Sequence, residues 1–115
     1  MLEMIKSKAV SLTGENYDSL VLQSTDVWII EVYMNGNDAC SRMAPFWENT
    51  IDTYGYVVKF GRIDAEKDVR LVHRLPFATS IFPTFFTISH HSAPALISFD
   101  SHNIGACKKY SLIFI

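Results

Sequence analysis

The sequence predicts an α/β fold, with a central mixed sheet of about four to five strands flanked by helices on both faces. Two observations predict it. Short runs of β-branched and aromatic residues, such as VWIIEVY at residues 27–33, are typical of buried strands. Between these runs, apolar residues recur at offsets of three and four, which is the spacing of amphipathic helices. Strands and helices that alternate along one chain indicate a layered α/β domain.

The chain begins with a predicted helix and a predicted strand. Tyr17, Leu20 and Val21 have helical spacing, and Thr13 is a suitable N-cap for that helix. The strand at 27–33 follows, and its continuous apolar character predicts burial on both faces.

A long helix is predicted from Asn37 to about Gly55. Its apolar residues fall on one face at offsets of three and four. They are Cys40, Met43, Trp47, Ile51 and Tyr54. The position of Cys40 on this stripe predicts a small buried side chain, which free cysteines often are.

The second half of the chain carries three more predicted strands, at 57–64, 84–88 and 95–99, with SHHSAP as the turn between the last two. A helix with apolar residues at positions 69, 72 and 75 precedes Pro76, which stops it. After about residue 100 two interpretations stay open: a closing helix from Gly105, or a frayed or cut end. We expect one domain across residues 1–115, as a piece of a larger protein.

Composition excludes several classes of function. The formal charge is −2, from ten basic and twelve acidic residues spread along the chain, so nucleic acid is not an expected partner. No apolar run approaches the roughly 20 residues that span a bilayer, so no membrane contact is expected from this segment. Two cysteines cannot form a disulfide framework, and no spacing of the four histidines resembles a metal site. We therefore expect no metal and no cofactor.

Four separated segments carry a family resemblance over roughly residues 10–88. These are EVYM with its acidic Glu31, CSRMAPFW with a helix proline at Pro45, GRIDAEKD with Asp64, and IFPT with Pro83. In this order they resemble the thioredoxin superfamily, most closely the thioredoxin-like domains of protein disulfide isomerases and their endoplasmic reticulum relatives. The resemblance implies the thioredoxin fold, with Pro83 in a cis-proline loop beside the active site.

The sequence departs from the family at the active site itself. Redox members carry tryptophan followed by C-x-x-C, which would fall on residues 36–40. Here Asn37 replaces the attacking cysteine, Gly36 replaces the tryptophan, and Cys40 stands at the second cysteine. Dithiol exchange needs a thiolate at the helix N-terminus and a second thiol to resolve the mixed disulfide. Asn37 is instead a good N-cap, and a carboxylate at Asp38 disfavours a nearby thiolate.

Glu31 would be a buried acid, which the resemblance associates with proton transfer in redox members. An alternative is an inherited group satisfied by a lysine such as Lys59 or by water.

The resemblance also implies a peptide-binding edge at the cis-proline loop, where an extended chain adds to the backbone without needing a cysteine. The candidate binding residues there are Met34, Gly36, Phe82, Pro83 and Thr84. Phe77 could extend this apolar rim.

The sequence therefore favours a non-catalytic module that binds unfolded or extended polypeptide or a partner domain, within a folding factor of the disulfide isomerase or J-domain co-chaperone type. The resemblance implies the endoplasmic reticulum lumen or secretory pathway as its location. The alternative is a monothiol enzyme that uses Cys40, with Glu31 as its buried acid. That alternative requires an exposed and acidic thiol at Cys40.

Overall fold

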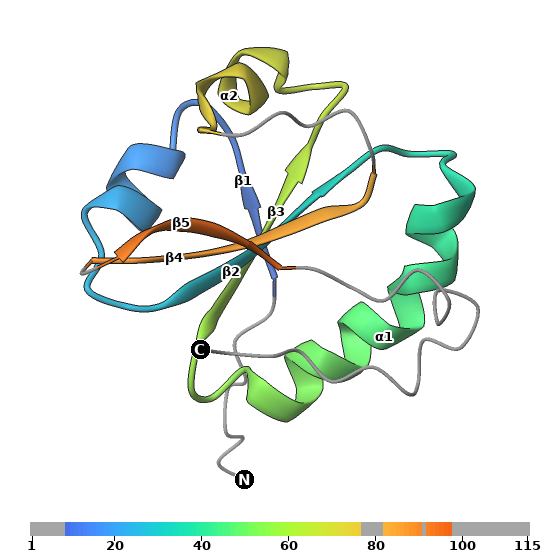
Figure 1. Cartoon of the computed structure of the whole chain (residues 1–115), viewed down its shortest axis with the longest axis horizontal. Helices are drawn as coiled ribbons and strands as arrows, with labels where there is room; N and C mark the ends of the chain where they lie inside the picture. Colours follow the sequence, from blue (N-terminus) through green and yellow to red (C-terminus); the bar gives the residue numbers. More distant parts are fainter. Residues whose placement is uncertain (1–8, 77–81, 91, 98–115) are drawn as a thin grey trace, which may run out of the picture.

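The structure, a computed structural model, describes residues 9–76, 82–90 and 92–97. A five-stranded mixed sheet forms its centre, in the order β1-β3-β2-β4-β5 (Figure 1). The strands are β1 (Val10–Leu12), β2 (Trp28–Tyr33), β3 (Lys59–Asp64), β4 (Thr84–Ser89) and β5 (Ser92–Ile97). The helical segments are η1 (Asp18–Leu22), α1 (Asp38–Tyr54) and α2 (Val69–Arg74), of which η1 is a π-helix.

The sheet combines a parallel half with an antiparallel half. β3 pairs in parallel with both β1 and β2, and α1 makes the crossover between β2 and β3. β4 runs antiparallel to β2, and β5 returns antiparallel to β4 as a hairpin. The predicted mixed sheet is therefore confirmed, with β2 at its centre between a parallel and an antiparallel neighbour.

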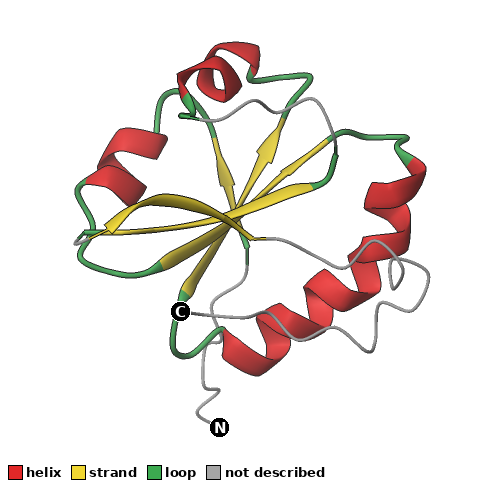
Figure 2. Cartoon of the chain, in the orientation of Figure 1, coloured by secondary structure: helices red, strands yellow, loops and turns green. Residues whose placement is uncertain are grey.

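Helices cover both faces of the sheet, as predicted, because alternate residues of β2 point to opposite sides. On one face Ile30 and Val32 join a buried cluster with η1 and α2, and on the other Ile29 packs with α1. Figure 2 shows the helices placed around the central sheet. The α1 cluster is built around Trp47, whose ring contacts Phe60 and Phe85 at centroid distances of 5.3 and 5.0 Å. All residues from Trp28 to Val32 are buried.

Several predicted boundaries were wrong. β1 was not predicted as a strand. The strand expected at 57–64 begins at Lys59, because Val57 lies in the preceding turn and is 79% exposed. β5 begins at Ser92 rather than Ala95, so the turn before it is shorter than expected. Thr13 does not cap η1; its hydroxyl accepts the Glu15 N–H in the turn before that helix.

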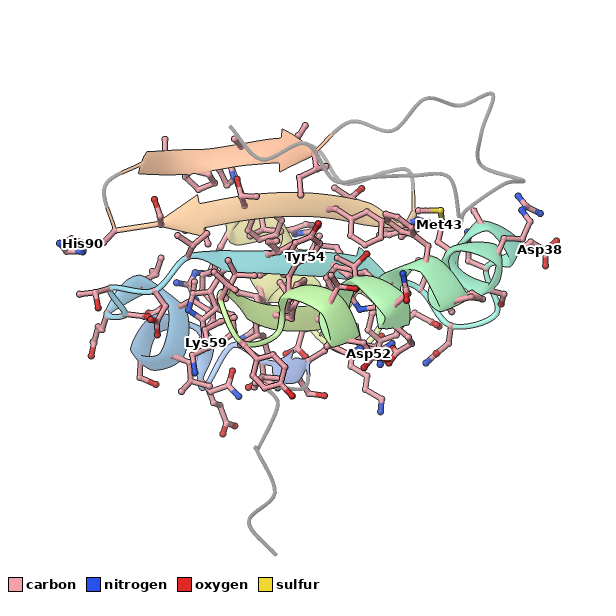
Figure 3. The ribbon with its side chains drawn as sticks, turned by 90° about the horizontal axis from the view of Figure 1, so that it is seen from below. Asp38, Met43, Asp52, Tyr54, Lys59 and His90 are labelled. Atoms are coloured by element: carbon pink, nitrogen blue, oxygen red, sulfur yellow. The ribbon has the colours of Figure 1, made fainter. Side chains whose placement is uncertain are left out.

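The long helix ends as predicted, with Gly55 as its C-cap. Its buried face is shifted from the predicted one: Met43, Trp47 and Ile51 are buried, and Phe46 and Thr50 join them. The two ends of the predicted stripe leave the core, since Tyr54 is exposed and Cys40 is half-buried. Figure 3 shows how the side chains of α1 spread along this helix.

Some residues that the sequence analysis considered lie outside the described ranges. They are Phe77 of the apolar rim, the histidines at 91 and 102, Phe99 at the end of the last predicted strand, Cys107, and the possible closing helix from Gly105. Across the described ranges, no helix has the length and apolar character needed to cross a bilayer.

Candidate functional site

A tight turn connects β2 to α1 and shapes the site. The Asn37 N–H donates to the Met34 carbonyl at 3.3 Å, which closes a four-residue turn. Gly36 occupies its third position with φ of 78°, a left-handed conformation that favours glycine. The position where redox relatives carry tryptophan is therefore a turn residue in this chain.

Asn37 is the N-cap of α1, as the sequence predicted. Its side-chain Oδ1 accepts a hydrogen bond from the Cys40 backbone N–H at 3.0 Å. Its own backbone is extended, with φ −81° and ψ 126°, which is usual for an N-cap. The N–H groups of the first helical turn can stabilise an anion. One of them, the Cys40 N–H, is instead bonded to the neutral side chain of Asn37.

Cys40 is half-buried, whereas the helix stripe predicted a buried side chain. It lies in the first turn of α1, shortly after the end of β2. Burial raises the pKa of the Cys40 thiol, a backbone hydrogen bond of Met34 lowers it in part, and the Glu31 carboxylate raises it further. Cys40 is therefore accessible in part, but its thiol is not an acidic one.

Glu31 lies in the middle of β2 and is 3% exposed. Its nearest cation is Arg62, with Nη2 at 3.9 Å from Oε1. Arg62 is the register partner of Glu31 on β3, whereas Lys59, the lysine suggested by the sequence, pairs with Trp28. Figure 3 shows Lys59 well away from Asp38, the first residue of α1.

The ionisation of Glu31 follows from this environment. The pKa of the Glu31 carboxyl is raised to about 7 overall: burial raises it most, the Arg62 guanidinium lowers it in part, and Glu48 adds to the rise. Arg62 is also shared with Tyr33, because its guanidinium lies over the Tyr33 ring at 4.5 Å from the centroid. One cation therefore serves a buried carboxyl and an aromatic ring.

A pocket of about 190 Å³ collects these groups. Residues of β2, the turn, α1 and β3 line it. They are Glu31, Tyr33, Met34, Asn35, Gly36, Asn37, Cys40, Ser41, Ala44, Trp47, Glu48 and Arg62. The structure thus brings together five of the residues that the sequence singled out. Sequence reasoning missed Arg62, and only the parallel register of β2 and β3 reveals it.

The remaining candidates lie on the neighbouring strand. Thr84 pairs with Val32, so the segment before it runs beside the end of β2 (Figure 1). The Phe82–Pro83 peptide bond is cis, and both residues are half-exposed. Phe82 and Met34 pack against the same core cluster, the one beneath η1 and α2. They form a second feature next to the pocket, since Phe82, Pro83 and Thr84 do not line it.

No group of three or more potential metal ligands occurs among the residues that the structure describes.

Comparison with known proteins identifies sequence relatives. The sequence profile of the family described as Thioredoxin matches residues 8–100. The chain is 30% identical over 78 residues to Protein disulfide isomerase-like 2-3 of Oryza sativa subsp. japonica. It is 34% identical over 58 residues to Protein disulfide-isomerase A6 of Homo sapiens. These matches cover 68% and 50% of this chain but 17% and 13% of those proteins.

Solved structures share the fold. The crystal structure of the J-Trx1 fragment of ERdj5 superposes with a TM-score of 0.72 at 18% identity, covering 80% of this chain and 44% of that one. ERdj5 form II gives a TM-score of 0.70 at 16% identity, covering 85% of this chain and 14% of that one. Because the family profile covers most of its length, and the sheet and helices have the expected arrangement, the chain belongs to the thioredoxin family.

Proposed function

We propose that the chain is a non-catalytic thioredoxin module that binds extended polypeptide or a partner domain within a larger protein-folding factor. The names of its relatives support the second part, since they are protein disulfide isomerases and, by fold, a protein with a J-Trx1 fragment. The chain spans less than a fifth of the length of those curated relatives. By the same relationship, we propose the lumen of the endoplasmic reticulum as its location.

The hydrogen bond from the Cys40 N–H to Asn37 carries the proposal that the site is non-catalytic. In a dithiol site, the residue at position 37 would be a thiolate stabilised by that end of the helix. Here the neutral side-chain amide of Asn37 accepts the hydrogen bond from the helix N-terminus, and the pKa of the Cys40 thiol is raised. Neither the attacking thiolate nor an activated second thiol is therefore supported at this helix N-terminus.

The binding surface that we propose is formed by Met34, Phe82 and Pro83. Met34 and Phe82 pack against the same core cluster, and each lies two residues beyond the last pair of the β2–β4 ladder, Val32 with Thr84. Both side chains are half-buried, so each presents apolar area while its base is fixed against the core. An extended polypeptide can pair with the backbone here and place an apolar side chain on this rim.

The experiment is a titration of the ¹⁵N-labelled chain with a reduced, permanently unfolded polypeptide, followed by NMR chemical shifts. We expect saturable shifts at residues 33–37 and 82–84, and at least fivefold weaker binding for Phe82→Ser. Val57→Ser is the matched control, because Val57 is an exposed apolar residue that lies before β3, at the opposite end of β2. Equal weakening by both variants, or shifts spread over the whole surface, would refute the proposed surface.

A monothiol activity at Cys40 is the second candidate, and the partial exposure of this residue in a pocket favours it. Thiol labelling of the native chain as a function of pH separates the two functions. We expect slow labelling at neutral pH with a pKa above that of a free cysteine. Rapid labelling at neutral pH together with catalysed glutathione exchange would favour the enzyme instead.

A further inference from the structure

The turn between β2 and α1 contains a side chain that can react with its own backbone. Asn35 is directly followed by Gly36, and both residues are exposed. The Gly36 nitrogen and the side-chain carbonyl carbon of Asn35 can close a five-membered ring by rotation about bonds of Asn35 alone. A glycine at the attacking position has no Cβ that would obstruct the approach. This turn therefore has the chemistry that deamidation of an asparagine needs.

Three features of the turn favour this reaction. Among the described residues, the Gly36 N–H has no hydrogen-bond partner, so solvent can remove its proton. A Cβ built on Gly36 would meet no atom within 4 Å, so water has access to the reacting atoms. In the part of the chain that the structure describes, the Asn35 side chain makes one hydrogen bond, in which its Nδ2 donates to Oδ2 of Asp64 at 3.4 Å. This bond is longer than usual, so it restrains the side chain only weakly.

The other asparagines of the described ranges are better protected. Both ends of the Asn16 amide are held, because its Oδ1 accepts the Thr13 N–H at 2.8 Å and its Nδ2 donates to a carbonyl of β1 at 3.1 Å. Oδ1 of Asn37 accepts the Cys40 N–H, and Asn49 lies inside the regular backbone of α1. The residues that follow them are tyrosine, aspartate and threonine, each with a Cβ beside the attacking nitrogen.

The reaction exchanges one bond and releases ammonia. The Gly36 nitrogen loses its proton to solvent and attacks Cγ of Asn35, and the Cγ–Nδ2 bond breaks as the leaving nitrogen takes up a proton. Water then hydrolyses the cyclic imide. Opening at Cγ gives aspartate. Opening at the main-chain carbonyl carbon gives isoaspartate, in which the backbone runs through the former side chain and gains one methylene.

Each product changes the turn that carries Met34. Aspartate replaces the Asn35 amide with a carboxylate beside Oδ2 of Asp64, so a hydrogen bond becomes a repulsion between like charges. The Asp64 carboxylate is held in place, because Asp64 is 8% exposed and its Oδ1 accepts two backbone N–H groups of the turn after β3. Isoaspartate also lengthens the turn that the Asn37 N–H closes on the Met34 carbonyl at 3.3 Å.

We propose that Asn35 deamidates spontaneously in the folded chain and that the isoaspartate product opens the turn at Met34. Met34 belongs to the proposed polypeptide surface, so the conversion also regulates binding there, and this last consequence rests on the proposed function. Since the released ammonia is lost to solvent, the surface is switched off with the age of the molecule rather than by a ligand. The site, the turn and the binding are measured separately.

The site is tested by ageing the folded chain at mildly alkaline pH and mapping deamidation by mass spectrometry of its peptides, where each conversion adds about 1 Da. We expect Asn35 to convert roughly tenfold faster than Asn16 or Asn49 in the same molecules, because it alone of these three precedes a glycine. Asn35→Gln is the matched control and should stay unmodified, because its longer side chain would close a less favourable six-membered ring. Conversion of Asn35 no faster than that of Asn16 and Asn49 would overturn the site.

The opened turn is tested by amide hydrogen exchange of the isoaspartate form, purified by chromatography. The Asn37 amide should exchange roughly tenfold faster than in the unmodified chain, because its bond to the Met34 carbonyl is lost. The Lys59 amide is the internal control, since it bonds to the Val27 carbonyl just before the start of β2 and should not change. Equal protection of the Asn37 amide in both forms would overturn the opened turn.

The same reduced, unfolded polypeptide then tests the consequence for binding. We expect the isoaspartate form to bind about fivefold more weakly than the fresh chain, because a rim that is no longer held in place must be ordered on binding. Aged Asn35→Gln should bind as tightly as fresh Asn35→Gln. Unchanged affinity of the isoaspartate form would overturn the regulation. Failure of the fresh chain to bind would contradict the proposed function and the regulation with it, while mass spectrometry and hydrogen exchange would still decide the site and the turn.

Discussion

Replacing Asn37 with cysteine should restore a disulfide to the N-terminus of α1. Asn37 is the N-cap, and its side chain reaches the Cys40 amide at 3.0 Å. Residues three apart at a helix start have Cβ atoms about 5–6 Å apart, so a small adjustment allows a disulfide. Under mild oxidant we expect Asn37→Cys to form a reversible bond to Cys40.

Two opposing effects set the stability of this variant. Loss of the cap should lower the free energy of unfolding of the reduced variant by about 1 kcal/mol. Closing a loop of about four residues by a disulfide should add roughly 2 kcal/mol to the oxidised form. The oxidised variant should therefore melt above the wild type, and roughly 8 °C above its own reduced form. Dithiol exchange should be weak, because Gly36 offers no aromatic side chain and Asp38 disfavours a thiolate.

The assay is thermal unfolding followed by circular dichroism, with and without reductant, together with mass spectrometry of the oxidised protein. Asn37→Ser is the control, since serine keeps an N-cap and adds no thiol. If both thiols of Asn37→Cys stay free under mild oxidant, the correspondence between residues 37–40 and the C-x-x-C motif is refuted, and the functional proposal loses its main support.

Three further changes test the rest of the site. Cys40→Ala should lower the free energy of unfolding by at most about 1 kcal/mol, because Cys40 is half-buried. Met43→Ala should lower it by about 2–4 kcal/mol, because Met43 is 2% exposed, and equal losses in urea denaturation would contradict this. The pKa of Glu31 is raised from 4.5 to about 7, so its contribution to the free energy of unfolding is fully present below pH 4.5 and is lost as the pH rises through 7. Glu31→Gln should remove this decline, which amounts to up to about 3 kcal/mol between pH 4.5 and 8. If the variant and the wild type show the same dependence of stability on pH, Glu31 is ionised throughout. Gly36→Ala should lower the free energy of unfolding by about 1–2 kcal/mol, because Gly36 has a φ of 78°. Gly14 also faces open space but has no positive φ, so Gly14→Ala should change stability by less than about 1 kcal/mol, and similar melting temperatures for the two variants would contradict this reasoning.

The sequence predicted the elements that have strong local signals. The run of residues 28–32 and the N-cap at Asn37 were both identified, since burial on two faces and capping depend on neighbouring residues. β1 was missed because its three residues carry no pattern of their own and become a strand only by pairing with β3. A local sequence pattern can predict a helix or a strand, but it does not show which distant strand pairs with it.

The candidate site was predicted in its residues but not in its contacts. Glu31 and Cys40 were singled out, yet the partner of Glu31 was expected to be Lys59 and is Arg62. Which basic residue faces Glu31 depends on the register of β2 against β3. If β3 were shifted by one residue, Arg62 would point to the other face of the sheet and a different residue of β3 would lie opposite Glu31. The half-burial of Cys40 likewise depends on where α1 begins relative to the end of β2, and helical spacing does not encode that position.

The topology has a consequence for how the site assembles. β2, α1 and β3 form one contiguous unit of residues 28–64, and β4 with β5 forms a hairpin of residues 84–97. Each can acquire much of its pairing locally, whereas the pairing of Trp28 with Ile88 closes a long loop between them. The pocket belongs entirely to the first unit, and Phe82 and Pro83 belong to the approach to the second.

The rim formed by Met34 and Phe82 therefore lies across the boundary between these two units. Loss of the β2–β4 pairing would divide the proposed polypeptide surface and would also remove Phe85 from the Trp47 ring that lines the pocket beside Cys40. If extended polypeptide binds this rim as proposed, the surface exists only once β2 and β4 have paired, so its binding should depend on completion of the sheet.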